Sequence, residues 1–153
     1  MEKALLDLVE SILEAANEMT LATIRPDGLP QATTVSFVNV GLNIFFGCRK
    51  QSQKARNLAR NRKVSIAISL PYAAWDQIRG LSIGGIAKRV SSKSEAKKVS
   101  KLLPTKSPET AAFAPYGMVG VVFFKVVPKV ITLLDYTKGL GHSTVIDVSG
   151  CDS

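Results

Sequence analysis

Hydrophobic and polar positions follow two rhythms along this chain, one typical of helices and one typical of strands. Near the start, apolar residues recur at helical spacing with acidic residues between them, which predicts an amphipathic helix over residues 3–17. From Met19 the period changes to two, and the turn signal Pro26-Asp27-Gly28 separates two extended runs, the second reaching from Gln31 to Val40. The first part of the chain therefore predicts a helix and a β-hairpin.

The next stretch combines a short strand, a polar turn and a helix. Gly41-Leu42-Asn43 turns the chain into the apolar strand Ile44-Phe45-Phe46, which we expect to break at Gly47-Cys48. The following helix is capped at Ser52 and runs to about Asn61. A strand that ends beside a helix N-terminus is a common setting for an anion site.

The second half predicts further strands and helices. Gly84-Gly85 lies inside one strand, where paired glycines mark a bulge, a close approach or, as we favour here, a barrel corner. Strands at this spacing predict an antiparallel meander that curls into a barrel. The predicted elements are strands at 63–70 and 81–90, a basic helix at 91–103 that ends before Pro104, a short helical piece at 109–113, and two extended runs, 118–128 and 129–136, that meet at Pro128.

One of these runs is almost continuously apolar. Residues 121–127 contain six valine and phenylalanine side chains that predict burial on both faces, either in the core or under a second subunit. After it comes a glycine-rich tail with His142, the one side chain with an ordinary pKa near neutrality. A lone histidine in such a loop is more often idle than functional.

Composition narrows the class of protein. A chain of 153 residues that is 46% apolar fits one compact domain over residues 1–153, with its N-terminal helix at about 2–17 and its tail at about 136–153. The acidic residues near the N-terminus argue against a signal peptide, and no apolar run reaches membrane-spanning length, so we expect a soluble, cytoplasmic protein. Cys48, Cys151 and His142 are too few for a disulfide framework or a metal site.

Charge points to an anionic ligand. The formal net charge is +8, and Arg49, Lys50 and Lys54 crowd the start of the helix capped at Ser52, where the macrodipole is already positive. A bound phosphate would neutralise this excess. The alternative is an ordinary solvated helix face, and neither a Walker motif nor GxGxxG is present.

No catalytic constellation accompanies this site. The acids are scattered, and neither a Ser-His-Asp nor a Cys-His set has motif support, so an enzyme built on this chain would take its chemistry from a cofactor. A flat, phosphorylated, redox-active cofactor would use the basic helix start together with the hydroxyl-bearing strand at 33–36.

The order of three segments resembles the pyridoxamine-phosphate oxidase-related family, the FMN-binding split barrels. They are TLATIRPDGLPQATTVSF, IFFGCRKQSQKARNLARNRKVSIAI and LSIGGIAKRV, and the likeness covers about residues 17–135. Its most specific piece is the S-x-K-A-x-N-L run at 52–58, followed by N-x-x-V-S at 61–65. The resemblance implies a mainly β fold with flanking helices, an antiparallel, Greek-key-like split barrel.

The resemblance also implies a site and a partner. The strand at 32–37 would lie along the isoalloxazine ring, and the segment from 47 to 54 would hold the ribityl phosphate. The family forms homodimers with two FMN sites at the subunit interface, and the segment near 75–82 closes the site. The candidate cofactor-binding residues are Thr33, Thr34, Val35, Ser36, Gly47, Cys48, Lys50, Ser52 and Lys54.

Departures from the family limit the functional prediction. The sequence lacks the C-terminal tryptophan-and-arginine segment of the true oxidases, which argues against oxidation of pyridoxamine phosphate. We expect an FMN-dependent oxidoreductase acting on an unassigned small molecule, with a tail that could reach the neighbouring subunit's flavin. One alternative is a deazaflavin in place of FMN. A second is a non-enzymatic protein that binds flavin, or that binds haem with His142 as axial ligand. A third is nucleic-acid binding through the helix at 91–103, which no recognition motif supports.

Overall fold

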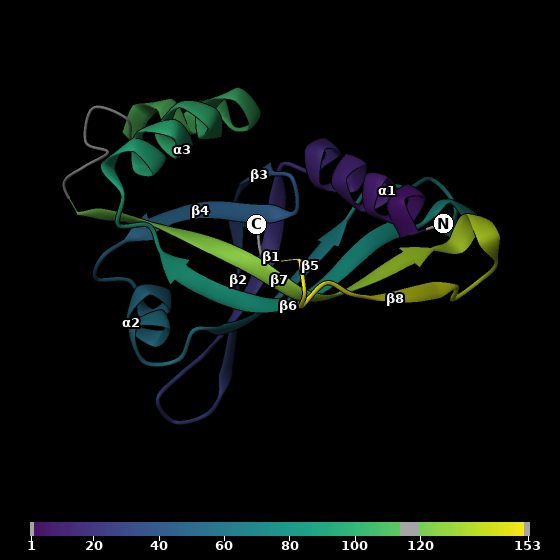
Figure 1. The fold of residues 1–153 in the computed structure, drawn as a ribbon, viewed down its shortest axis with the longest axis horizontal. Helices are drawn as coiled ribbons and strands as arrows, with labels where there is room; N and C mark the ends of the chain where they lie inside the picture. Colours follow the sequence, from purple (N-terminus) through teal and green to yellow (C-terminus); the bar gives the residue numbers. More distant parts are fainter. Residues whose placement is uncertain (1, 114–119, 152–153) are drawn as a thin grey trace.

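A computed structural model describes residues 2–113 and 120–151 of the protein. This part contains one antiparallel sheet that curls into a half-barrel, with helices packed against it (Figure 1). The predicted split β-barrel is confirmed. The strands are β1 (Glu18–Ile24), β2 (Pro30–Ser36), β3 (Val38–Val40), β4 (Asn43–Arg49), β5 (Lys63–Ser69), β6 (Arg79–Arg89), β7 (Val121–Asp135) and β8 (Ser143–Asp147), and the helices are α1 (Glu2–Ala15), α2 (Gln53–Arg60) and α3 (Lys93–Lys106), with short 3-10 turns η1 (Trp75–Gln77), η2 (Pro108–Phe113) and η3 (Tyr136–Lys138).

The hydrophobic periods of the sequence determine which face each element buries. In β5, Val64, Ile66 and Ile68 are buried while the residues between them are exposed. In α1 the apolar stripe buries Val9 and Ile12 against the sheet. The main core therefore lies between the concave side of the half-barrel and α1.

The sheet has the strand order β2-β1-β5-β6-β7-β4-β3, and β8 pairs with β7. The predicted hairpins β1-β2 and β3-β4 are both present, and β5 to β8 follow one another as a meander. The predicted antiparallel meander holds for β5 to β8 but not for the whole sheet, because β1 pairs with β5 and β4 pairs with β7 across it.

Strand β7 is the longest strand and is covered on both faces. Its inward residues join the main core, where the Phe124 and Phe46 rings stack with centroids 5.4 Å apart. On the other face Phe123 packs with Phe45 and with Val99 of α3 in a second cluster. A single chain therefore buries both faces of the described part of the apolar run; Met118 and Val119, at the start of the predicted strand, lie outside the described residues.

Pro128 was expected to separate two runs, but β7 passes through it. Gly85 is paired with Pro128 and Gly84 with Val130, so the register between β6 and β7 shifts by one residue at this point. A Cβ on Gly85 would lie 2.7 Å from the backbone oxygen of Val127. The glycine pair thus marks a β-bulge with close backbone approach, two of the three interpretations the sequence allowed.

Two boundaries were predicted wrongly because tertiary contacts extend the elements. Strand β4 does not break at Gly47-Cys48 but continues to Arg49, because this whole segment pairs with the start of β7. Helix α3 does not end before Pro104 but continues to Lys106, where burial of Leu103 and a hydrogen bond from Lys106 Nζ to the backbone of α1 stabilise the last turn.

The extended run from Gln31 to Val40 is also two strands. Phe37, which has no exposed surface, separates β2 from β3 and points into the core. Beyond it the chain changes partner, because β2 pairs with β1 whereas β3 pairs with β4. The burial of one aromatic ring therefore coincides with a corner of the sheet.

Candidate functional site

The candidate site is centred on the start of α2. Ser52 is in extended conformation and its Oγ accepts a hydrogen bond from the backbone N–H of Ala55 at 3.2 Å. The same hydroxyl donates to the carbonyl of Arg49 at 2.8 Å, which closes the loop between β4 and α2. The predicted cap is confirmed, and the N–H groups before Ala55 have no intrahelical acceptor.

Positive side chains surround this helix start. We call Arg49, Lys50, Ser52 and Lys54 the anion cradle. Arg49 and Lys50 are exposed, Lys54 is half-buried, and the first turn of α2 contains no acid. The ion pairs found among residues 2–113 and 120–151 involve none of these cations. Because the helix dipole is also positive here, the cradle is electrostatically suited to a phosphate.

Two predicted residues at the end of β4 face in opposite directions. Cys48 packs against the main core, and burial raises the pKa of its thiol, an effect opposed by the polar side chain of Ser52 and by the charge of Lys54. A Cβ on Gly47 would instead lie 2.9 Å from Cε1 of Phe123, on the face covered by α3. The structure therefore brings Cys48 to the cradle, whereas Gly47 serves packing under α3.

The predicted ring-binding strand β2 lies at one end of the strand order, so one of its edges has no strand partner within the described chain. Thr33 is half-buried and Val35 is buried on the side of the core. Thr34 and Ser36 alternate with them and point to the opposite face. The four residues consequently do not offer their side chains to one ligand, but the free backbone edge can hydrogen bond to one.

Sequence reasoning missed a buried polar network that joins α2 to β2. Asn57 is polar but has no exposed surface, and it belongs to the S-x-K-A-x-N-L run at 52–58. Its Nδ2 donates to Thr23 Oγ1 at 3.0 Å and to Gln31 Oε1 at 3.2 Å, and its Oδ1 accepts from Gln53 Nε2 at 2.8 Å. The motif was the only sequence signal for these contacts, because their partners are distant in the chain.

The other predicted parts of the site lie at the far end of the same chain. Trp75 is 69% exposed in η1, which contacts η3, and His142 is exposed in the loop between η3 and β8. In Figure 1, α2 lies at one end of β7 and β8 at the other. Since β7 spans roughly 50 Å, neither residue reaches the anion cradle of its own chain.

A buried carboxylate lies near this far end. Asp135 is 2% exposed, and its Oδ1 accepts hydrogen bonds from Arg79 Nε at 3.3 Å and from the Thr137 backbone N–H at 3.2 Å. Burial acts to raise the pKa of Asp135, but the contacts with Thr137 and Arg79 outweigh it and the net shift is downward. The group is therefore held as a charged carboxylate that fixes the start of the tail.

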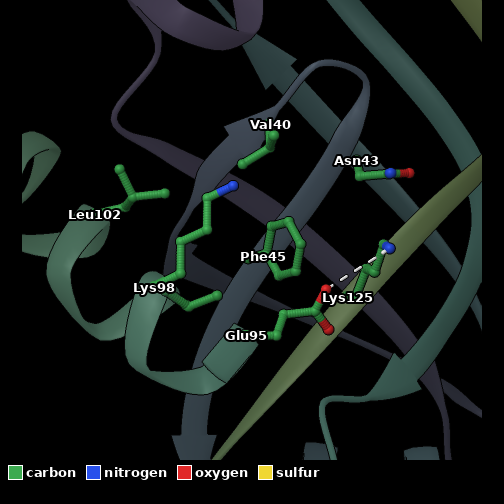
Figure 2. Close-up of a pocket in the computed structure, with 8 residues that line it drawn as sticks. Val40, Asn43, Phe45, Glu95, Lys98, Leu102 and Lys125 are labelled. Atoms are coloured by element: carbon green, nitrogen blue, oxygen red, sulfur yellow. Dashed lines mark ion pairs between the residues drawn. The ribbon is translucent and has the colours of Figure 1, made fainter. Parts of the chain in front are cut away.

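A separate small cleft lies beneath α3 (Figure 2). Its volume is about 110 Å³, and Lys98 extends across it toward Val40 while Glu95 pairs with Lys125 at 3.9 Å. Ligand pockets typically measure about 300–1,000 Å³, so the cleft is too small for a flavin or a haem. It is lined by Val40, Asn43, Phe45, Glu95, Lys98, Val99, Leu102 and Lys125.

Residues 2–113 and 120–151 lack two other features, a metal-binding cluster and a membrane-spanning helix. No three side chains among their histidines, cysteines, aspartates and glutamates are grouped to hold a metal ion. No helix in these ranges has the length and apolar character needed to cross a membrane.

The described residues form an antiparallel split barrel with a basic helix start and an open strand edge. The sequence model of the pyridoxamine 5'-phosphate oxidase family matches residues 5–135. The protein belongs to this family, and the predicted relationship is confirmed. A comparison with curated proteins gives no match.

Solved structures with the same fold include proteins with different ligands. The protein Rv2991 of Mycobacterium tuberculosis is 28% identical, with a TM-score of 0.75 over 95% of this chain and 92% of that one. An F420 reductase is 27% identical, with a TM-score of 0.66 over 80% and 94%. A heme binding protein from Mycobacterium smegmatis is 19% identical, with a TM-score of 0.80 over 93% of this chain and only 57% of that one, a likeness of fold alone.

Proposed function

We propose that the protein binds FMN noncovalently and is an FMN-dependent oxidoreductase acting on a small molecule. The observation that carries the proposal is the anion cradle, whose cations have no acidic partner among the described residues and crowd a positive helix terminus. Membership of the pyridoxamine 5'-phosphate oxidase family and the similarity to an F420 reductase support a flavin or deazaflavin ligand.

The residues present fit the phosphate end of this ligand. Lys54 and Lys50 would supply charge, and the first turn of α2, which Ser52 caps, would supply its free N–H groups. The open edge of β2 at Thr33 to Ser36 would offer backbone groups to the polar edge of the ring. Bound FMN would accept a hydride from a donor and pass electrons to an acceptor.

We propose further that the protein acts as a homodimer. Two rows of residues, each paired across neighbouring strands, cross the convex face of the sheet. The first row carries no charge and consists of Thr34, Thr20, Ala67, Ser82, Thr132 and Val145. The second row ends in a charged residue and consists of Ala32, Ala22, Ser65, Gly84, Val130 and Asp147. We call these two rows the outer face. Val145 is 67% exposed and Val130 41%. A second copy seated here would cover the exposed valines and could bring its tail toward this chain's anion cradle.

An absorption spectrum tests the first step. The purified protein, or protein incubated with FMN and then desalted, should show the flavin bands, and a parallel incubation with a deazaflavin separates the two cofactors. A protein that retains neither has no flavin function. Oxidation of a nicotinamide by the loaded protein would then test the redox role.

Haem is the second candidate, favoured by the similarity in fold to the Mycobacterium smegmatis heme binding protein. His142, the single histidine, is exposed at the turn before β8 and is free to serve as an axial ligand. Titration with haemin should then give a Soret band that His142→Ala abolishes. A titration without such a band excludes this function.

A further inference from the structure

A continuous chain of side-chain hydrogen bonds runs from the anion cradle to β2. Arg56 Nη1 donates to the Gln51 carbonyl, in the loop of the cradle, at 3.2 Å, and its Nη2 donates to Gln53 Oε1 at 2.8 Å. Gln53 Nε2 then donates to Asn57 Oδ1 at 2.8 Å, and Asn57 Nδ2 donates to Gln31 Oε1 at 3.2 Å. The loop that would hold a phosphate is thus bonded to the strand that would hold a ring.

Asn57 is the one fully buried residue in this series of hydrogen bonds, and every hydrogen-bonding atom of its side-chain amide has a partner. Both Nδ2 protons have acceptors, Thr23 and Gln31, and Oδ1 has a donor in Gln53. These contacts fix which way the amide points, because a flipped amide would place Nδ2 against the Gln53 donor. The side chain therefore defines the position of α2 relative to both β1 and β2.

We propose that Asn57 is a positioning residue that sets the spacing between the anion cradle and β2, and thereby makes the site select phosphorylated over unphosphorylated flavin. The proposal rests on the proposed function. A ligand gains from the phosphate contact and the ring contact together only when both are held at the separation its own structure requires. Riboflavin, which lacks the phosphate, gains nothing from this coupling.

A purely structural role for Asn57 makes a different prediction. Loss of a buried hydrogen-bond network destabilises the fold whatever its function, but the folded fraction would then bind both flavins with unchanged preference. The ratio of riboflavin Kd to FMN Kd therefore separates positioning from stability.

The test compares three full-length variants with the wild type by flavin fluorescence titration, with thermal unfolding measured in parallel. Asn57→Ala removes all the side-chain hydrogen bonds that Asn57 makes. Gln31→Met removes only the contact from Asn57 to β2, at a half-buried position outside α2, so we expect α2 to stay folded. Asn61→Ala is the matched control, because this asparagine caps the other end of α2, and within the described residues its side chain bonds only to the Lys63 backbone.

We expect Asn57→Ala and Gln31→Met to weaken FMN binding about tenfold, the effect of roughly one hydrogen bond, with a much smaller change for riboflavin and with Asn61→Ala behaving as wild type. If the wild type prefers FMN and the variants keep the same preference, the positioning role of Asn57 is overturned while the proposed function stands. A wild type that binds no FMN would overturn the proposed function and this inference with it. If Asn57→Ala does not fold, Gln31→Met decides.

Discussion

Lys106 bonds the last turn of α3 to the last turn of α1: its Nζ lies 2.7 Å from the carbonyl oxygen of Leu13. The same ammonium lies 4.0 Å from the centroid of the Phe37 ring. The carbonyl end of α1 is negative and contains no basic residue of its own, so a cation from α3 stabilises it. Burial lowers the pKa of Lys106 to about 8, while the charge of Glu14 opposes the shift.

This lowered pKa predicts a pH-dependent stability. The unfolded chain keeps the proton up to the ordinary value of 10.5, so between about 8 and 10.5 the unfolded state binds more protons and the residue's contribution to stability rises with pH. Urea denaturation from pH 7.5 to 10 should therefore show the wild type gaining stability relative to Lys106→Met. Lys97→Met, exposed on the same helix, is the control. Parallel curves for wild type and Lys106→Met would contradict the assignment.

The anion cradle predicts that Lys54→Ala weakens FMN binding. Loss of a charge-assisted hydrogen bond should cost about 1.5–3 kcal/mol, measured as the change in Kd by fluorescence titration. Lys101→Ala, which removes an exposed lysine on α3, should leave the Kd unchanged. An equal affinity of Lys54→Ala and wild type would place the phosphate elsewhere.

The two glycines in β6, Gly84 and Gly85, should lose different amounts of folding stability when each is replaced by alanine. A Cβ on Gly85 meets the Val127 backbone oxygen at 2.7 Å, whereas a Cβ on Gly84 meets only a methyl group of Val130 at 3.1 Å. A side chain can move but the paired backbone cannot, so Gly85→Ala should lower the free energy of unfolding by about 1–3 kcal/mol and Gly84→Ala by less. Chemical denaturation of both variants decides, and equal losses would refute the bulge argument.

The outer face predicts the oligomeric state. We expect the wild type to have about twice its chain mass of 16.4 kDa by light scattering. Val130→Lys and Val145→Lys should shift it toward the monomer, because each places a charge on that face. Leu29→Lys, at an exposed apolar position in the β1–β2 turn, is the control. A wild type that is monomeric, or variants that stay dimeric, would reject this interface.

Local patterns were sufficient to predict most elements and the start of the site. The Ser52 cap and the period of β5 follow from residues close together in sequence, and the structure retains both. The cations beside Ser52 were visible for the same reason. That no acid of the described residues pairs with them could be seen only in the structure, because acids from distant parts of the chain could have reached them.

The features that were missed depend on distant partners. Asn57 contacts Gln31 and Thr23, which are 26 and 34 residues away, so its burial could not be read from the helix alone. The sequence predicted a turn at Gly47, but in the structure Gly47 pairs with β7 and the Phe123 ring lies where a side chain would be. Lys106 extends α3 past Pro104 because its acceptor, Leu13, belongs to another helix.

Strand β7 holds β4, β6 and β8 together in one sheet. One of its edges pairs with β6 along most of its length, while the other is shared by β4 in the first half and β8 in the second. The amides of β7 that hydrogen bond to β4, β6 or β8 can therefore reach solvent only if these neighbouring strands detach. Their hydrogen exchange should require opening of the whole barrel, so the slowest amides will report its global stability.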